Sequence, residues 1–239
     1  MATLTINNAY CGSINIEYGL LYNWYTVADD RKITSSDDWS VPMDSQFDDL
    51  ITYLGGAGSV AAISMKESGL TYWNTDNGLN TSNLNMRGAG GRNTSGLYIQ
   101  LKTNLDYWAS NEYNSTSGNI MNMTDPTPAV HTATGGDFKS EGHSIILVSD
   151  ATGRSDGDIA IYTGNDGQVY TAVAINELYW TQQNLIETKF RDGSIIPFHG
   201  VDNDENFTNA EWAALTTAGV CAYNNDLSNA APGFSWPTS

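Results

Sequence analysis

The chain has 239 residues, 40% of them hydrophobic, and its 27 acidic and ten basic residues give a net charge of −17. This hydrophobic content supports a packed core and argues against disorder. The negative charge repels phosphate backbones and anionic lipid headgroups, so neither nucleic acid nor a membrane is predicted as a partner. We interpret the acidic surface as one that keeps a densely displayed protein soluble, with cation binding as the alternative.

Residues 1–17 are predicted to form an N-terminal strand or docking arm. Residues 2–6 and 14–16 alternate apolar and polar side chains, as short strands do, and an ordinary edge strand is the alternative. The first residues lack a basic stretch and an unbroken apolar run, and no part of the chain reaches membrane-spanning length. We therefore expect no export signal, which is typical of a protein that assembles in the cytoplasm.

The run from residue 18 to 56 combines an aromatic strand, a polar turn and an amphipathic helix. Pro42 precedes the helix and Gly55-Gly56 follows it. Between them, apolar side chains recur at helical spacing, at Met43, Phe47, Leu50, Ile51 and Leu54. The pattern predicts a helix over 43–54, around which we expect the rest of the domain to be built.

From residue 60 to 150, the sequence predicts one short helix and four strands. The helix is expected over 60–66, and residues 69–96 are rich in turn signals. The strands are predicted over 97–101, 107–110, 120–123 and 144–148. Prolines and glycines occur throughout residues 124–142, where we expect a long exposed loop.

The C-terminal part of the chain begins with a Gly- and Asp-rich segment, residues 151–157, which we interpret as a linker. Strands are predicted over 158–162 and 169–175, around a turn at 165–167. Thr208 and Glu211 have the spacing of a capping box and predict a short helix. The tail, 232–239, is expected to be loose or bound to a partner.

Three motifs carry a family resemblance: YGLLYNW at 18–24, WSVP at 39–42 and LGG at 54–56. With residues 65–74 and 90–112, they resemble the Fibrobacter succinogenes major paralogous domain, as found in phage and Bacteroidota surface proteins. The resemblance implies an α+β, C-type-lectin-like fold with short antiparallel strands, two or three helices and long loops. Leu147 stands where the family has a cysteine, which argues against the family's disulfide.

The two halves of this domain stand in permuted order. Residues 167–226 resemble the beginning of the family's domain, although they follow the residues that resemble its end. The resemblance thus assigns 18–150 to the second half and 158–239 to the first half. Either the chain is circularly permuted, or the halves are domain-exchanged between chains of a homo-oligomer such as a trimer.

The sequence predicts no catalytic residue and no cofactor. Gly153 to Gly157 have the spacing of a nucleophile elbow, but a strand pattern follows them where the elbow needs a helix. His131, His143 and His199 lack metal-ligand spacing, and we interpret them as loop or surface histidines.

No metal site is predicted either. Residues 202–206 begin like a calcium loop, but Phe207 and Ala213 stand where the loop needs Gly and Glu. The calcium-binding triplets of sugar-binding C-type lectins do not occur in the sequence. Cys11 and Cys221 are far apart, and both free thiols and a bonded pair remain open.

A ligand-binding face is predicted in the Asn- and Tyr-rich stretch 97–123, the counterpart of the family's ligand face. Rigid aromatics and short amides are typical of adaptable binding surfaces. The candidate binding residues are Tyr98, Gln100, Asn104, Asp106, Asn111, Tyr113 and Asn114. Tyr107 and Trp108, in the same stretch, also fit a core motif of the family.

We therefore expect a non-enzymatic phage virion protein, a capsid, tail-fibre or decoration module displayed as a homo-oligomer. Its expected partners are copies of itself, other virion proteins and a glycan or protein of the host surface. The alternative is an exported bacterial cell-surface adhesin or polysaccharide-binding module.

Overall fold

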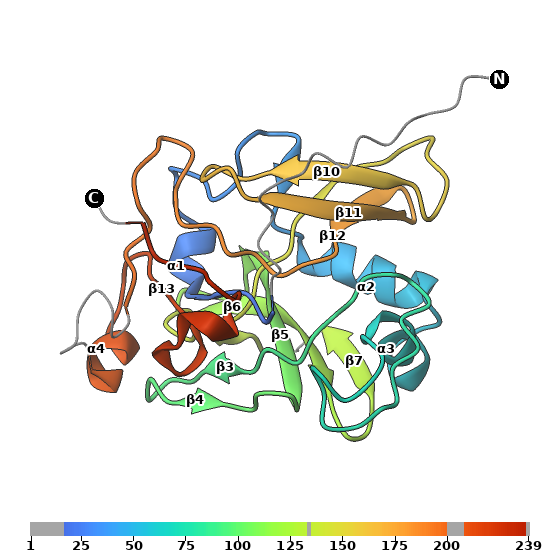
Figure 1. The fold of residues 1–239 in the computed structure, drawn as a ribbon, viewed down its shortest axis with the longest axis horizontal. Coiled ribbons are helices and arrows are strands. Elements are labelled where there is room, and N and C mark those ends of the chain that lie inside the picture. The colour runs from blue at the N-terminus through green and yellow to red at the C-terminus, as the bar shows by residue number, and fades with distance from the viewer. Residues whose placement is uncertain (1–16, 133–134, 200–207, 238–239) are drawn as a thin grey trace.

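The computed structural model describes residues 17–132, 135–199 and 208–237 and shows a mostly-sheet α+β fold with few helices (Figure 1). The helices are α1 (Trp24–Val27), α2 (Asp44–Tyr53), α3 (Ser59–Met65) and α4 (Asn209–Ala213), with short 3-10 turns at Tyr223–Asn225 and Leu227–Asn229. The strands are β1 (Leu21–Tyr22), β2 (Trp39–Ser40), β3 (Gly91–Arg92), β4 (Tyr98–Ile99), β5 (Asn104–Glu112), β6 (Ser117–Thr124), β7 (Ala129–Thr132), β8 (Asp137–Phe138), β9 (Val148–Asp150), β10 (Ile159–Thr163), β11 (Val169–Ile175), β12 (Leu178–Thr181) and β13 (Val220–Cys221).

These strands form two larger sheets and two short ribbons, and all their ladders are antiparallel. The five-stranded sheet has the order β10-β11-β12-β9-β2. The second sheet has the order β5-β6-β7, with β8 also paired to β6, and the ribbons are β1-β13 and β3-β4. In Figure 1, β10 to β12 lie above β5 to β7, with α2 and α3 on one side and α4 on the other.

The predicted helices are confirmed where their signals are local. Helix α2 follows Pro42, and the Gln46 side chain accepts a hydrogen bond from the backbone N–H of Met43. Its buried face packs into the core through Phe47, whose ring lies 5.7 Å from that of Trp180. Helix α4 begins with the predicted capping box of Thr208 and Glu211. The turn between β10 and β11 is confirmed as well.

Segments from the N-terminal and the C-terminal part of the chain share the five-stranded sheet, the β1-β13 ribbon and the hydrophobic core. Strand β9 lies between β12 and β2, and β13 pairs with β1. One core cluster joins Leu20 and Trp108 with Phe190 and Val220, and another joins Phe47 with Trp180. Residues 17–150 therefore bury their apolar side chains against residues 159–237 of the same chain.

The aromatic strand expected within 18–56 is β1, and α1 follows it, where the buried Asn23 side chain caps the helix by accepting from the N–H of Thr26. One expectation for the N-terminal part is wrong. The loop expected over 124–142 contains β7 and β8. Val130 is buried between the sheet and the helices, so burial of one face holds this Pro- and Gly-containing segment in a sheet.

The structure also departs from expectation just before β9 and in the C-terminal tail. Ile145, Ile146 and Leu147 are buried but lie before β9, which begins at Val148. The tail is described to residue 237, and there Trp236 is buried with its ring stacked 4.5 Å from Phe198. The predicted strands at 2–6 and 14–16 and the calcium-like loop at 202–206 lie outside the described residues.

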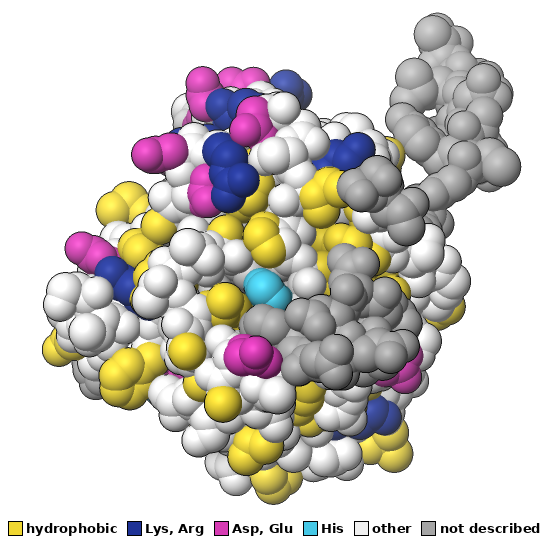
Figure 2. Space-filling model, turned by 90° about the vertical axis from the view of Figure 1, so that its left-hand side faces the viewer, with side chains coloured by type: hydrophobic (Ala, Val, Ile, Leu, Met, Phe, Trp, Pro, Cys, Tyr) yellow, Lys and Arg dark blue, Asp and Glu magenta, His cyan; other side chains and the backbone are white. Residues whose placement is uncertain are grey.

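The charged side chains are unevenly distributed on the face drawn in Figure 2. Acidic and basic groups gather at one end of it, while most of the remaining surface is uncharged or hydrophobic. None of the helices in the described ranges is long and apolar enough to cross a membrane.

Gly96 tests the contact between β3-β4 and α4. Its φ is +73°, and an added Cβ would overlap the backbone oxygen of Asn209. We expect Gly96→Ala to lower the free energy of unfolding by about 2 kcal/mol or more, measured by urea denaturation with tryptophan fluorescence.

Gly153→Ala is the matched control, because its φ is +79° and nothing lies within 4 Å of an added Cβ. It should cost only the left-handed backbone strain, about 1 kcal/mol. Equal losses in both variants would contradict the proposed contact with α4.

Candidate functional site

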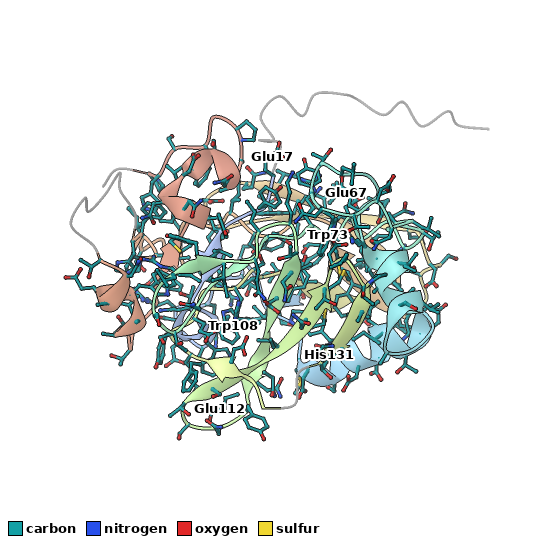
Figure 3. All side chains as sticks on the ribbon, turned by 90° about the horizontal axis from the view of Figure 1, so that it is seen from below. Glu17, Glu67, Trp73, Trp108, Glu112 and His131 are labelled. Atoms are coloured by element: carbon teal, nitrogen blue, oxygen red, sulfur yellow. The ribbon has the colours of Figure 1, made fainter. Side chains whose placement is uncertain are left out.

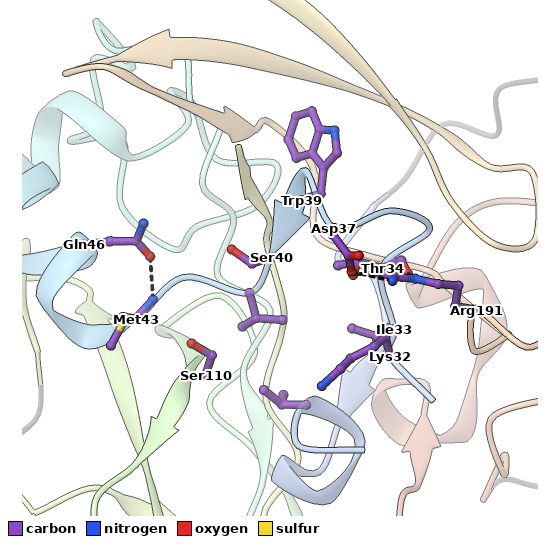
Figure 4. A pocket seen from close by; sticks show the side chains of 12 residues that line it. Lys32, Ile33, Thr34, Asp37, Trp39, Ser40, Met43, Gln46, Ser110 and Arg191 are labelled. Atoms are coloured by element: carbon purple, nitrogen blue, oxygen red, sulfur yellow. Dashed lines mark hydrogen bonds and ion pairs between the residues drawn. The ribbon is translucent and has the colours of Figure 1, made fainter. Parts of the chain in front are cut away.

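A pocket of about 420 Å³ opens where the loop between α1 and α2 meets β5 and the C-terminal part of the chain (Figure 4). Residues 32–43 form most of its wall. The rest of the wall comes from Val27 of α1, Gln46 of α2, Ser110 of β5 and Arg191. A pocket of this volume accommodates a small ligand such as one sugar unit.

Arg191 holds the pocket loop in place from the far end of the sequence. Its Nη1 donates to Asp37 Oδ1 at 2.5 Å, its Nε to the Thr34 backbone oxygen at 2.8 Å, and its Nη2 to Thr34 Oγ1 at 3.1 Å. The ion pair with Arg191 lowers the pKa of the exposed Asp37 carboxyl. Arg191 therefore holds the loop at Thr34 and Asp37 in position and neutralises the Asp37 carboxylate.

The interior of the pocket combines a hydrophobic floor with polar groups. Ile33 and Val41 are buried, whereas Lys32, Ser40 and Ser110 present an ammonium and two hydroxyls. In Figure 4 the Lys32 side chain points toward the space that separates it from Ser110. Lys32 has a φ of 61°, which is uncommon for a residue other than glycine. The pocket thus offers one cation and several hydrogen-bonding groups to a ligand.

Trp39 forms the upper border of this pocket. It is half-buried, and its ring lies 5.1 Å from that of Tyr162 in β10. The contact with the five-stranded sheet fixes the indole in position. A fixed aromatic ring at a pocket rim provides apolar contact area with little loss of side-chain entropy on binding.

The predicted ligand face is divided by the structure. Tyr98, Gln100 and Asn104 lie at or near one end of β5, and Asn111, Tyr113 and Asn114 lie at or beyond its other end. Tyr98 is half-buried, and its hydroxyl donates to the Asn225 side chain while its ring packs on Tyr223. A single contiguous patch of the seven candidates is therefore not formed.

Asp106 and Asn111 have internal partners. Asp106 is only 6% exposed and accepts a hydrogen bond from Asn122 Nδ2, so placing it on the surface was wrong. Burial raises the pKa of its carboxyl despite the opposing effect of His143. Asn111 accepts from the backbone N–H of Asp44 at the start of α2. Residues 105–109 of β5 are all buried, so both faces of this part of the strand are covered, which composition alone does not reveal.

Asn114 supports the hairpin turn by accepting from the backbone N–H groups of Thr116 and Ser117. Tyr113, beside it, is 54% exposed, and Gln100 is exposed in the turn before β5. The residues that line the pocket were not predicted from the sequence. The WSVP motif at 39–42 was the one signal in the sequence that could have indicated them, because its first three residues line the pocket.

His143 is buried, so its interpretation as a loop or surface histidine was wrong. Its Nε2 lies 3.0 Å from Asp137 Oδ2 and 3.5 Å from Glu141 Oε2. Burial disfavours the imidazolium, but the two carboxylates outweigh burial and raise the pKa of His143 to about 10. His131 is exposed on β7, and His199 is partly buried.

Cys221 is a buried free thiol in β13, whereas Cys11 lies outside the described residues. Burial raises the pKa of the Cys221 thiol, which opposes formation of the reactive thiolate. A structural role in the core is the simplest account of this side chain.

Arg191→Gln tests whether the arginine holds the pocket loop. We expect faster amide hydrogen exchange in residues 33–38 and unchanged exchange in α2, because three hydrogen bonds to the loop are lost or weakened. Hydrogen exchange with mass spectrometry measures this. Arg154→Gln removes an exposed arginine from the turn before β10 and is the control. Equal exchange in the two variants would contradict the anchoring role.

Part of the chain matches the model of a known protein family. Residues 7–143 match the Fibrobacter succinogenes major domain, which is more than half of the chain, and the match includes the YGLLYNW and WSVP motifs. No curated protein and no solved structure was found to match. The chain belongs to the Fibrobacter succinogenes major domain family.

Proposed function

We propose that this protein is a non-enzymatic recognition module of a phage virion that binds an acidic sugar unit of a host-surface glycan. The pocket between residues 32–46, Ser110 and Arg191 carries this proposal. Lys32 supplies a positive charge for a carboxylate or another anionic substituent, and the serine hydroxyls supply hydrogen bonds to sugar hydroxyls. Trp39 supplies an apolar rim.

The charge of the pocket supports an anionic ligand. The chain as a whole is strongly acidic, yet the described lining of the pocket contains two basic residues and one carboxylate, Asp37. Asp37 is paired with Arg191, so Lys32 contributes the cation that a ligand meets. A local excess of positive charge on an acidic protein selects for a negatively charged group.

The same lining favours binding over sugar hydrolysis. Most glycosidases use two carboxyl groups that flank the scissile bond. Among the described residues of this pocket, Asp37 is the single carboxylate, and its ion pair lowers its pKa. A general acid needs the opposite shift.

The virion setting remains our first proposal, with display as a homo-oligomer beside other virion proteins. The acidic composition suits a densely displayed protein, because like charges keep neighbouring copies soluble. The second candidate is a bacterial cell-surface adhesin or polysaccharide-binding module. It is favoured by the family, whose name refers to a bacterium.

We further propose that the fold is C-type-lectin-like with its two halves in permuted order. The pairing of β13 with β1 and of β12 with β9 supports association of the halves within one chain. The family match ends at residue 143, so the C-terminal half rests on its motifs at 167–226 and on this pairing.

Lys32→Gln is expected to weaken binding to intact Bacteroidota cells, or to their purified surface glycans, by about tenfold, because a charge-assisted contact is lost. Binding of labelled protein is measured by flow cytometry and by glycan array. Free acidic monosaccharides should compete, whereas neutral ones should not. Lys102→Gln makes the same charge change in the turn before β5 and serves as the control.

Tyr113→Ala distinguishes binding in the pocket from binding at the face that was predicted from the sequence. Loss of binding in this variant with full binding in Lys32→Gln would move the site to the hairpin end of β5 and refute the pocket. Binding to none of the cells or glycans by folded protein would refute host recognition and leave a structural decoration module.

A further inference from the structure

Asp137, Glu141 and His143 bring three metal-ligating side chains together beside the core. Asp137 lies in β8, Glu141 in the turn after it, and His143 in the segment that bridges to Tyr22. Their ligand atoms all lie within 4.8 Å of one another. None of the three residues lines the pocket described above.

The imidazole of His143 is placed as a ligand would be. The residue is 3% exposed, and its ring lies 4.5 Å from that of Trp108, which fixes it (Figure 3 shows Trp108). Nε2 points at the two carboxylates, yet neither ring nitrogen has a hydrogen-bond partner of acceptable geometry. Nε2 is held there by its ion pair with the two carboxylates, and a metal ion bound between the three groups would take the place of the imidazolium proton.

On the other side of the ring, Nδ1 has no hydrogen-bond partner. Nδ1 faces the backbone at Gly91, where an added Cβ would lie 3.1 Å from it. The nearby Asp106 carboxyl accepts from Asn122, and burial raises its pKa, so the charge of the cluster comes from Asp137 and Glu141. Two carboxylates facing one imidazole nitrogen are an arrangement that suits a bound cation.

We propose that Asp137, Glu141 and His143 form a binding site for one divalent transition-metal ion, with Zn²⁺ as the first ion to test. One imidazole nitrogen and two carboxylate oxygens suit Zn²⁺, whereas Ca²⁺ and Mg²⁺ prefer oxygen ligands alone. Three protein ligands leave a coordination position for water. The Asp137 and Glu141 side chains are 33% and 15% exposed, which gives the ion access from solvent.

The ion would connect segments that the fold brings together. His143 exchanges backbone hydrogen bonds with Tyr22, and Asp137 pairs with Gly118 of β6. Binding would therefore join the β8 turn to the centre of the molecule and stabilise the folded state.

Isothermal titration of the EDTA-treated full chain with ZnCl₂ tests the site. We expect one Zn²⁺ ion to bind per chain and to raise the melting temperature of the protein. Co²⁺ bound in place of Zn²⁺ should give the visible d–d absorption that is typical of a low-symmetry coordination site. Asp137→Asn and Glu141→Gln should each weaken Zn²⁺ binding by about tenfold or more. Their side chains are partly exposed, so these variants are expected to fold.

His131→Gln and Asp49→Asn are the controls, because both residues are exposed and lie outside the cluster (His131 is labelled in Figure 3). They should bind Zn²⁺ as the unmodified chain does. Absence of binding by the unmodified chain would overturn the proposal. So would unchanged affinity in Asp137→Asn and Glu141→Gln, or loss of binding in the controls alone.

Discussion

The fold depends on satisfying the backbone of the buried segment Leu20–Asn23. Buried N–H and C=O groups need partners, and this segment forms only a two-residue strand with β13. Other partners come from distant parts of the chain: the N–H of Leu20 donates to Leu185, that of Tyr22 to His143, and that of Asn23 to Gly219. The Tyr22 oxygen also accepts from Trp108 Nε1 at 2.7 Å. The YGLLYNW motif is thus the place where the N-terminal, middle and C-terminal segments are joined.

Both candidate sites derive their geometry from this segment. Asn23 caps α1 and also bonds to Thr217 and Gly219, so it fixes the start of the loop that becomes the pocket wall. On the other side, the backbone pairing of Tyr22 with His143 holds the imidazole at Asp137 and Glu141. A rigid centre with sites on the loops that leave it is a common arrangement for binding proteins.

Local signals in the sequence were sufficient for α2, α4 and the β10-β11 hairpin, because caps, apolar spacing and turn residues lie within a few positions of each other. The pocket could not be predicted in this way. It needs Arg191 beside Asp37 and Thr34, a contact between residues more than 150 positions apart. Composition likewise proposed Asp106 as a surface residue, although both faces of β5 are covered at residues 105–109 and Asp106 is buried. Tertiary contacts between distant residues therefore determine where the pocket forms and which of the predicted binding residues are buried.

The pairing of β1 with β13 has a consequence for how the protein forms in the cell. Leu21 and Tyr22 are synthesised long before their partners Cys221 and Val220. Contacts this distant slow folding, since a long loop must close before they contribute. Until then, the apolar residues around Leu20 are exposed on the nascent chain, where they invite aggregation. The core around Leu20 is therefore completed only after the segments that contain Leu185 and Val220 have been synthesised.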